Sequence, residues 1–187
     1  MASLLKVDKL DPQSGTALEI GTSGDTITVP SGATFNVAGT MQSGGVTVAN
    51  TPAVLVTNSG NQSIATATNT LVTFDTETID TDSAFASNVF TVPSGEDGMY
   101  FISFRGSMQG IDAGEFIQLR IYLNGVASDF FESRMTAYTT DVEFKFSSSG
   151  ALNLSAGDTI SYYVYQNSGD SQDLTTAGLY IFKLIGA

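Results

Sequence analysis

The stretch Met99-Tyr-Phe-Ile-Ser-Phe-Arg-Gly-Ser-Met108 decides the fold class of this chain. In its first half every second residue is large and apolar, so an extended backbone places these side chains on one face. The same alternation recurs in Thr159–Gln166. Both stretches are typical of half-buried strands, and the side chains expected in the core are Tyr100, Ile102, Phe104, Ile160 and Tyr162.

Further strands are expected on both sides of this stretch, separated by closely spaced turn signals. The expected strands cover residues 53–56, 70–74, 89–92, 99–108, 116–123, 142–146, 159–166 and 179–185. Asn124-Gly125 is the strongest short turn signal in the chain. No ten-residue window shows a convincing helical period. Residues 51–187 are therefore expected to form an antiparallel all-β domain, either a sandwich or a jelly roll.

Residues 1–50 have a different pattern, with no Tyr and a single Phe. Their apolar residues come in pairs separated by one polar residue, and the pairs recur at a short and nearly constant spacing between Gly-Ser-Asp turns. The paired residues are Leu18, Ile20, Ile27, Val29, Phe35 and Val37. A two-residue apolar face cannot bury itself alone, so residues 1–50 are expected to form a repetitive β shaft, solenoid-like or intertwined, whose missing core comes from neighbouring rungs or from other chains around an axis. The alternative is a Gly-Ser linker.

Composition excludes several functional classes. The chain has 187 residues, no Cys, no His and a net charge of −12. Without Cys and His it has no thiolate nucleophile, no imidazole base and no zinc or haem site of the usual ligand types. The negative charge argues against nucleic-acid binding, and no apolar run is long enough to span a bilayer. Because Ser and Thr nucleophiles would lack an activating base, we expect a protein that is not an enzyme and needs no cofactor.

Acidic residues suggest one further site. Four carboxylates lie close together in the sequence, at Asp75, Glu77, Asp80 and Asp82. Hard oxygen ligands at alternate spacing are suited to Ca²⁺, but the spacing is not that of an EF-hand loop. The favoured interpretation is an exposed edge strand whose charges repel other strands, so no metal is expected. Asp112 and Glu115 form a second acidic pair, for which a plain turn is favoured.

Two aromatic pairs are candidates for a subunit interface or a ligand contact. Tyr163 and Tyr165 alternate with the expected core residue Tyr162, so they face the other side of their strand. Phe130 and Phe131 lie in a predicted loop, where exposed Phe side chains suggest an interface or a contact tip.

Three motifs in the second region belong together. They are Phe90-Thr-Val-Pro93 with Gly98-Met-Tyr-Phe-Ile-Ser-Phe104, a strand that ends in Asn124-Gly125, and Leu152-Asn-Leu-Ser-Ala-Gly-Asp-Thr-Ile160. In this combination the region 53–187 resembles the C1q/TNF-like family of jelly rolls, and the resemblance implies a trimer. The chain departs from the family pattern at Ile102, where a Phe is usual, and at Glu96-Asp97, which lengthen a loop.

The first region also contains a recognisable stretch, Gly24-Asp-Thr-Ile-Thr-Val-Pro-Ser-Gly-Ala-Thr34, followed by Phe35-Asn-Val37 and Gly39-Thr40. It is similar to N-terminal segments of small virion proteins of tailed phages, especially marine phages. This resemblance implies a segment that anchors a distal domain to the virion.

Taken together, the two resemblances imply a phage virion structural protein, assembled in the host cytoplasm as a homotrimeric fibre. Residues 1–50 would contact other virion proteins, and residues 51–187 would form a knob displayed to a host surface glycan or protein. Two alternatives stay open. One is a capsid decoration or head-fibre protein without a receptor role, and the other is a bacterial surface module resembling a lectin.

Overall fold

The chain divides into two units, Met1–Thr40 and Met41–Ala187, whereas the sequence suggested a change of character at residue 50. The structure is a computed structural model, and it describes residues 18, 20–43, 46–48, 51–140 and 142–184. The second unit begins with a short antiparallel pair, β1 (Gln42–Ser43) and β2 (Val46–Thr47). Gly44 and Gly45 lie outside the described residues.

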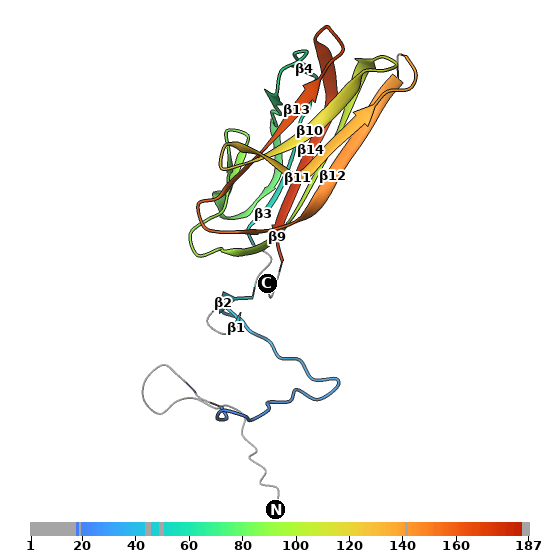
Figure 1. The fold of residues 1–187 in the computed structure, drawn as a ribbon. Coiled ribbons are helices and arrows are strands. Elements are labelled where there is room, and N and C mark those ends of the chain that lie inside the picture. The colour runs from blue at the N-terminus through green and yellow to red at the C-terminus, as the bar shows by residue number, and fades with distance from the viewer. Residues whose placement is uncertain (1–17, 19, 44–45, 49–50, 141, 185–187) are drawn as a thin grey trace, which may run out of the picture. The chain divides into compact units, whose positions relative to one another are not determined.

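Two antiparallel sheets account for the rest of the second unit. The first has six strands in the order β11-β10-β13-β8-β7, and β5 also pairs with β13. Figure 1 labels β10, β11 and β13 of this sheet. Its strands are β5 (Thr70–Leu71), β7 (Phe85–Ala86), β8 (Val89–Thr91), β10 (Phe116–Leu123), β11 (Val126–Thr136) and β13 (Thr159–Gln166).

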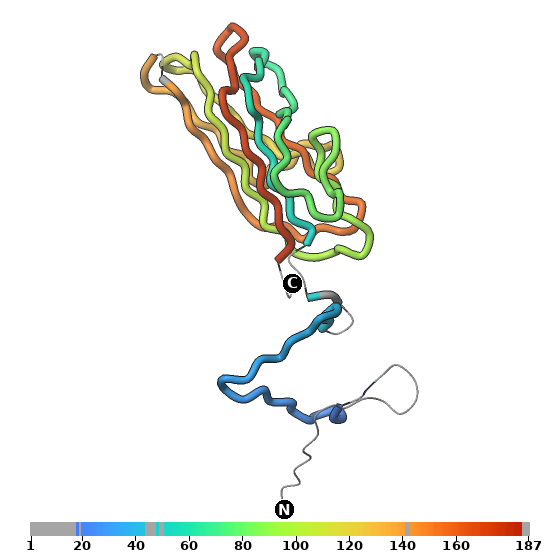
Figure 2. Tube along the Cα trace, turned by 180° about the vertical axis from the view of Figure 1, so that it is seen from behind, coloured from blue at the N-terminus to red at the C-terminus, as the bar shows by residue number. Residues whose placement is uncertain are grey.

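The second sheet also has six strands, in the order β12-β9-β14-β3-β6, with β4 paired to β14. In Figure 2 it lies in front, with β12 in orange, β14 in red and β3 in cyan. Its strands are β3 (Ala53–Thr57), β4 (Gln62–Ile64), β6 (Thr76–Asp80), β9 (Gly98–Ile111), β12 (Val142–Leu154) and β14 (Gln172–Lys183). A single 3₁₀ turn, η1 (Thr81–Ser83), follows β6. Among the described residues, no helix has the length and apolar character needed to cross a membrane.

The core lies between the two sheets. Alternate residues of each strand point inward, and the side chains of Tyr100, Ile102, Phe104, Ile160 and Tyr162 are fully buried there. The Phe104 ring on β9 stacks on the Tyr162 ring on β13, with a centroid distance of 4.6 Å. This stack joins the middle strands of opposite sheets, so the alternation that defines each strand also fixes how the sheets face each other.

The prediction of an antiparallel all-β jelly-roll sandwich is confirmed. The structure differs from the sequence-based expectation at several strands. β4, β7 and β11 were not among the expected strands, and β14 begins at Gln172 although its predicted start was Leu179. β12 continues to Leu154 although its predicted end was Phe146. β11 and β12 are long edge strands, one in each sheet.

The first unit has little regular structure in its described part. Residues 18 and 20–40 contain no strand, and two tight turns are closed by hydrogen bonds from Asp25 N to Thr22 O and from Ala33 N to Pro30 O, both 3.0 Å. All of these residues are exposed, including the six paired apolar residues, whose exposed fractions run from 38% to 71%. The intertwined β shaft requires other chains and stays a prediction.

Candidate functional site

The outer face of the first sheet carries an aromatic surface. On β10, Ile117, Leu119 and Ile121 point into the core, so Phe116 and Tyr122 point outward. On β13 the same alternation turns Tyr163 and Tyr165 outward, as the sequence predicted.

These outward rings form two pairs across neighbouring strands. Tyr122 lies against Tyr163 at a centroid distance of 3.9 Å, and Phe116 stacks on Tyr165 at 5.7 Å. From β11, the Arg134 guanidinium covers the Phe116 ring at 3.6 Å. We call Phe116, Tyr122, Arg134, Tyr163 and Tyr165 the aromatic face. Flat rings with a stacked guanidinium suit contact with a sugar ring or a protein side chain.

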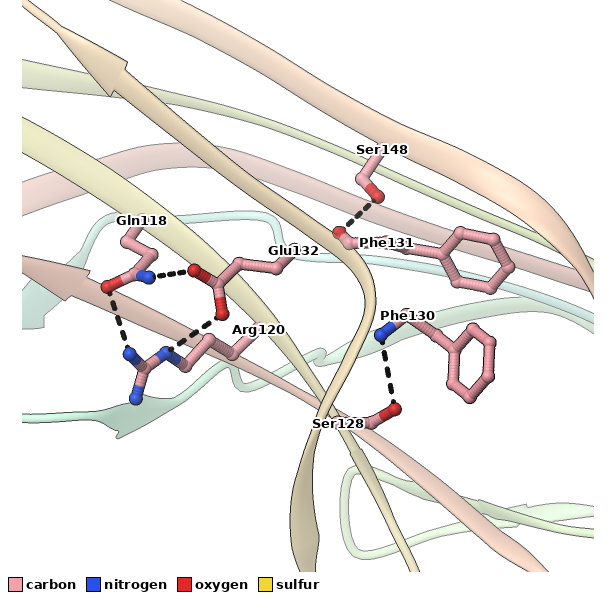
Figure 3. A network of polar contacts seen from close by, with 7 residues as sticks. All are labelled: Gln118, Arg120, Ser128, Phe130, Phe131, Glu132 and Ser148. Atoms are coloured by element: carbon pink, nitrogen blue, oxygen red, sulfur yellow. Dashed lines mark hydrogen bonds and ion pairs between the residues drawn. The ribbon is translucent and has the colours of Figure 1, made fainter.

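A polar network lies between the two ring pairs. Gln118 and Arg120 are the β10 residues opposite Tyr165 and Tyr163, respectively. Gln118 donates a hydrogen bond to Glu132 and accepts one of 3.2 Å from Arg120, while Arg120 Nε lies 3.7 Å from a Glu132 oxygen (Figure 3). The network fixes the side chains between the rings, so the aromatic face presents a preformed surface.

The predicted contact pair Phe130-Phe131 lies in a bulge of β11. The pairing register shifts there, so that residues 129–132 stand opposite Arg120 alone. Phe130 is 59% exposed, and its N–H donates to Ser128 Oγ at 3.2 Å. Phe131 has a φ of +60° and packs against the core, and its carbonyl accepts a hydrogen bond of 2.6 Å from Ser148 on β12 (Figure 3). The two residues therefore differ in role, because Phe130 is available for contact whereas Phe131 ties β11 to β12.

The acidic stretch forms an edge strand and its following turn. Asp75 accepts hydrogen bonds of 2.7 Å from both Ser59 N and Ser59 Oγ, and the hydroxyl bond is the main reason that the pKa of Asp75 is lowered. Asp80 accepts hydrogen bonds from the backbone N–H groups of Ala84 and Phe85, at 2.8 Å and 3.1 Å. Glu77 and Asp82 are exposed. β6, which contains Glu77 and Asp80, is the outermost strand of its sheet.

No group of three or more acidic side chains in the described part of the chain is arranged to hold a metal ion. In the second acidic pair, Asp112 N donates to a Glu115 carboxylate oxygen at 2.7 Å, which is the geometry of a capped turn. Calcium binding stays an untested expectation.

Part of the aromatic face was not predicted from the sequence. Phe116, Tyr122 and Arg134 were not singled out, although the alternation of β10 contains the signal for the first two. Their meeting with Tyr163 and Tyr165 depends on the pairing of β10 with β13, two strands that are far apart in the chain and are aligned from Ile117↔Gln166 to Leu123↔Ile160. The local sequence pattern of each strand does not predict how β10 and β13 align with each other.

Comparison with known proteins supports the fold. No protein-family model matches the chain, and no curated protein sequence matches it. Among solved structures, the chain is similar to one described as the globular domain of zebrafish complement 1qA protein, with a TM-score of 0.52 and 19% sequence identity. The match covers 72% of this chain and 97% of that one. The two antiparallel sheets of this chain therefore form a jelly-roll sandwich with the fold of a C1q globular domain.

Proposed function

We propose that this chain is a homotrimeric virion structural protein of a tailed phage, in which residues 1–50 form an intertwined shaft and residues 51–187 form a knob displayed for host attachment. The shaft binds other virion proteins, and the aromatic face contacts a glycan or protein of the host surface. The proposal includes no catalysis, no cofactor, no nucleic-acid binding and no membrane insertion.

One observation carries the trimer proposal, namely the exposure of the six paired apolar residues in a single chain. Burying a side chain of this size contributes about 1.5–3 kcal/mol, so these six leave on the order of 10 kcal/mol unrealised. Three chains that bring equivalent pairs to a common axis recover this burial. The sequence similarity of Gly24–Thr40 to phage virion segments supplies the biological setting.

A second apolar surface supports association of the knobs. The outer face of the second sheet carries the apolar patch, which consists of Leu55, Ile79, Phe101, Tyr180 and Phe182. The Phe101 and Phe182 rings stack at 5.8 Å with an angle of 8° between their planes. Phe182 pairs with Ala53, and Lys183 N donates to Pro52 O at 3.1 Å, so the patch adjoins the point where the chain enters the sandwich. We propose that the patches of neighbouring knobs contact one another in the trimer.

Native mass spectrometry of the full chain tests the assembly. We expect a single species with three times the chain mass of 19.6 kDa. A monomer that persists at micromolar concentration would overturn the trimer proposal.

Binding to cells tests host attachment. The labelled full chain is incubated with a panel of marine bacteria, and we expect it to stain a subset of them. The variant Tyr163→Ala/Tyr165→Ala should lose most of this staining while its thermal midpoint shows that it remains folded. Tyr138→Ala is the matched control, because Tyr138 is exposed and lies outside the aromatic face. If the trimer binds to virions but stains no strain in the panel, the proposal of a fibre for host attachment is wrong. A capsid decoration protein without a receptor role would then be the better assignment.

A further inference from the structure

The outer face of the second sheet is hollowed beside Arg105. A depression of about 440 Å³ is lined by Arg105, Ser107, Glu143, Lys145, Ser147 and Thr176, and we call it the Arg105 depression. It lies on the three strands β12, β9 and β14, where Lys145 and Thr176 flank Ser107 and where Ser147 flanks Arg105. Its volume is within the range of small-molecule sites in proteins.

Small residues create this hollow and position the arginine. Ser107, Ser147 and Gly178 surround Arg105 on the outer face, and Gly178 is its direct partner on β14. A Cβ atom at position 178 would lie 3.1 Å from Arg105 Nε and 3.3 Å from the Tyr180 ring. The glycine therefore lets Arg105 reach across β14, where its guanidinium carbon lies 5.5 Å from the centre of the Tyr180 ring.

The charge of Arg105 is not neutralised. The chain has 19 acidic and 7 basic residues, and three of the described cations form ion pairs with carboxylates: Lys183 with Glu96, Arg120 with Glu132 and Lys145 with Glu143. Within the described residues Arg105 has no such pair. The Lys145–Glu143 pair spans 3.4 Å and both side chains are exposed, so it is a weak pair from which Lys145 can turn toward a ligand. With two cations and one carboxylate in its lining, the depression has a net charge of +1 on an acidic protein.

Hydroxyl groups complete the lining. The Ser107 hydroxyl is buried, and its oxygen lies 2.6 Å from Thr175 Oγ1 and 2.8 Å from Thr176 Oγ1. Thr175 Oγ1 also donates to the Ser107 carbonyl at 3.2 Å. These contacts fix the hydroxyls of Ser107, Thr175 and Thr176 relative to one another. Hydroxyls both donate and accept hydrogen bonds, which suits the hydroxyls of a sugar.

We propose that the Arg105 depression binds a saccharide that bears a carboxylate. Arg105 and Lys145 hold the carboxylate, and the exposed hydroxyls of Ser147 and Thr176 bind the hydroxyls of the ring, while the buried Ser107 hydroxyl positions Thr176. A nucleic-acid backbone does not fit this site, because a chain with a net charge of −12 repels a polyanion. The proposal deepens the host-attachment function and rests on it for the biological source of the ligand. Three copies of a weak site would add avidity in a trimer.

NMR titration of the full chain tests the proposal with three probes. D-glucuronate carries both the carboxylate and the ring hydroxyls, glucose carries the ring hydroxyls without the charge, and acetate carries the charge alone. We expect glucuronate to shift the Arg105 guanidinium signal and the Ser107 and Ser147 amide signals, with a Kd on the order of 1 mM. Glucose and acetate should bind at least about tenfold more weakly. Equal binding of acetate, equal binding of glucose, or no binding of glucuronate would each overturn the proposal.

Variants locate the site. R105Q should weaken glucuronate binding by about tenfold or more. R105K keeps the charge but loses the planar guanidinium that lies over Tyr180, so it should bind more weakly than the parent chain and more tightly than R105Q. N153D is the matched control, because it changes the net charge by the same unit as R105Q. Asn153 is exposed on β12, about 20 Å along the strand from Ser147. An equal loss in N153D and R105Q would mean that only net charge matters, and the site would be rejected.

The failure of this proposal is distinguishable from failure of the proposed function. The trimer mass and the staining of cells are both measured without glucuronate. The staining depends on Tyr163 and Tyr165, which lie on the sheet opposite to that of Arg105. A chain that forms trimers and stains cells but ignores glucuronate would refute the Arg105 site alone.

Discussion

Gly150 on β12 shows how one residue determines the packing of a neighbouring strand. A Cβ atom at position 150 would clash with the Phe131 ring, which packs over the glycine from the β11 bulge. Gly150→Ala would displace this ring from the core margin, so we expect a loss of about 2 kcal/mol in the free energy of unfolding, measured with denaturant. Ser149→Ala is the control, since Ser149 is exposed on the other face. Equal stability of the two variants would show that Phe131 does not occupy this place.

Asp158 shows how a carboxylate holds two turns together. It accepts hydrogen bonds of 2.8 Å from the Asn124 side chain and from Ser155 N, and these bonds, the one from Asn124 first, lower its pKa. Because the folded pKa is lower than the unfolded one, the stabilisation is complete above the unfolded pKa of about 4 and is lost as the pH falls through the folded pKa.

Asp158→Asn should therefore destabilise the chain on the order of 1 kcal/mol at neutral pH, because the amide retains only one acceptor oxygen. The difference in thermal midpoint between the parent chain and this variant should shrink as the pH is lowered below about 4. A difference that stays constant from neutral to acidic pH would contradict the role of the ionised carboxylate.

Single residues were predictable from sequence where alternation alone decides their environment. The inward positions of Phe104 and Tyr162 and the outward positions of Tyr163 and Tyr165 follow from a period of two. Arg105 follows the same period, yet its significance depends on Gly178, which reaches it only through the pairing of β9 with β14. A local pattern cannot indicate which residue will stand beside another across a sheet.

At the scale of elements, β11 and the second half of β12 were not predicted, for two different reasons. β11 contains a bulge at residues 129–132 that breaks its alternation. In β12 the run Ser147-Ser-Ser-Gly150 is typical of a turn, but the backbone stays extended because it pairs with β9 continuously from Phe144 to Leu154. In both cases tertiary pairing overrides local preference.

The end of β14 is joined to the loop before β9 by an ion pair. Lys183 Nζ lies 2.9 Å from a Glu96 oxygen, and the Lys183 side chain is only 8% exposed. Tyr100 donates a hydrogen bond of 2.6 Å to the Glu96 carbonyl, so the loop is held at two points. Glu96 lies in the two-residue extension that distinguishes this chain from the C1q/TNF-like pattern.

Glu96→Gln should leave a buried ammonium without its carboxylate and cost about 2 kcal/mol, less than a fully buried pair because Glu96 is partly exposed. Lys183→Met removes the charge but keeps the volume, so it should cost less than about 1 kcal/mol. In the double variant, Glu96→Gln should add little to Lys183→Met. Additive effects in this cycle, measured by denaturant unfolding, would show that the two side chains do not interact.

At the scale of the whole molecule, the two units differ in how far their own sequence determines their structure. The sandwich is specified by one chain, because its strands bury their apolar faces against each other, and its fold was predictable from strand alternation and from the Tyr100 and Gly157-Asp158 motifs. The described residues of the first unit leave their paired apolar side chains exposed in one chain. This exposure is what we expect of a segment that packs against other chains, as proposed above, but the regular spacing of the apolar pairs does not specify that packing.

Charge placed in the middle of the first unit gives the most direct test of this dependence. Ile27→Asp/Val29→Asp would put two carboxylates per chain on the proposed axis, where six charges would lose their hydration next to one another. We expect native mass spectrometry to show monomers of this variant, while its thermal midpoint for the sandwich stays near that of the parent chain. Ser23→Asp/Ser31→Asp adds the same charge at exposed polar positions of the same segment and should remain trimeric. Trimers that persist in the first variant would place Ile27 and Val29 away from the axis, and assembly would then have to come from the apolar patch of the knob.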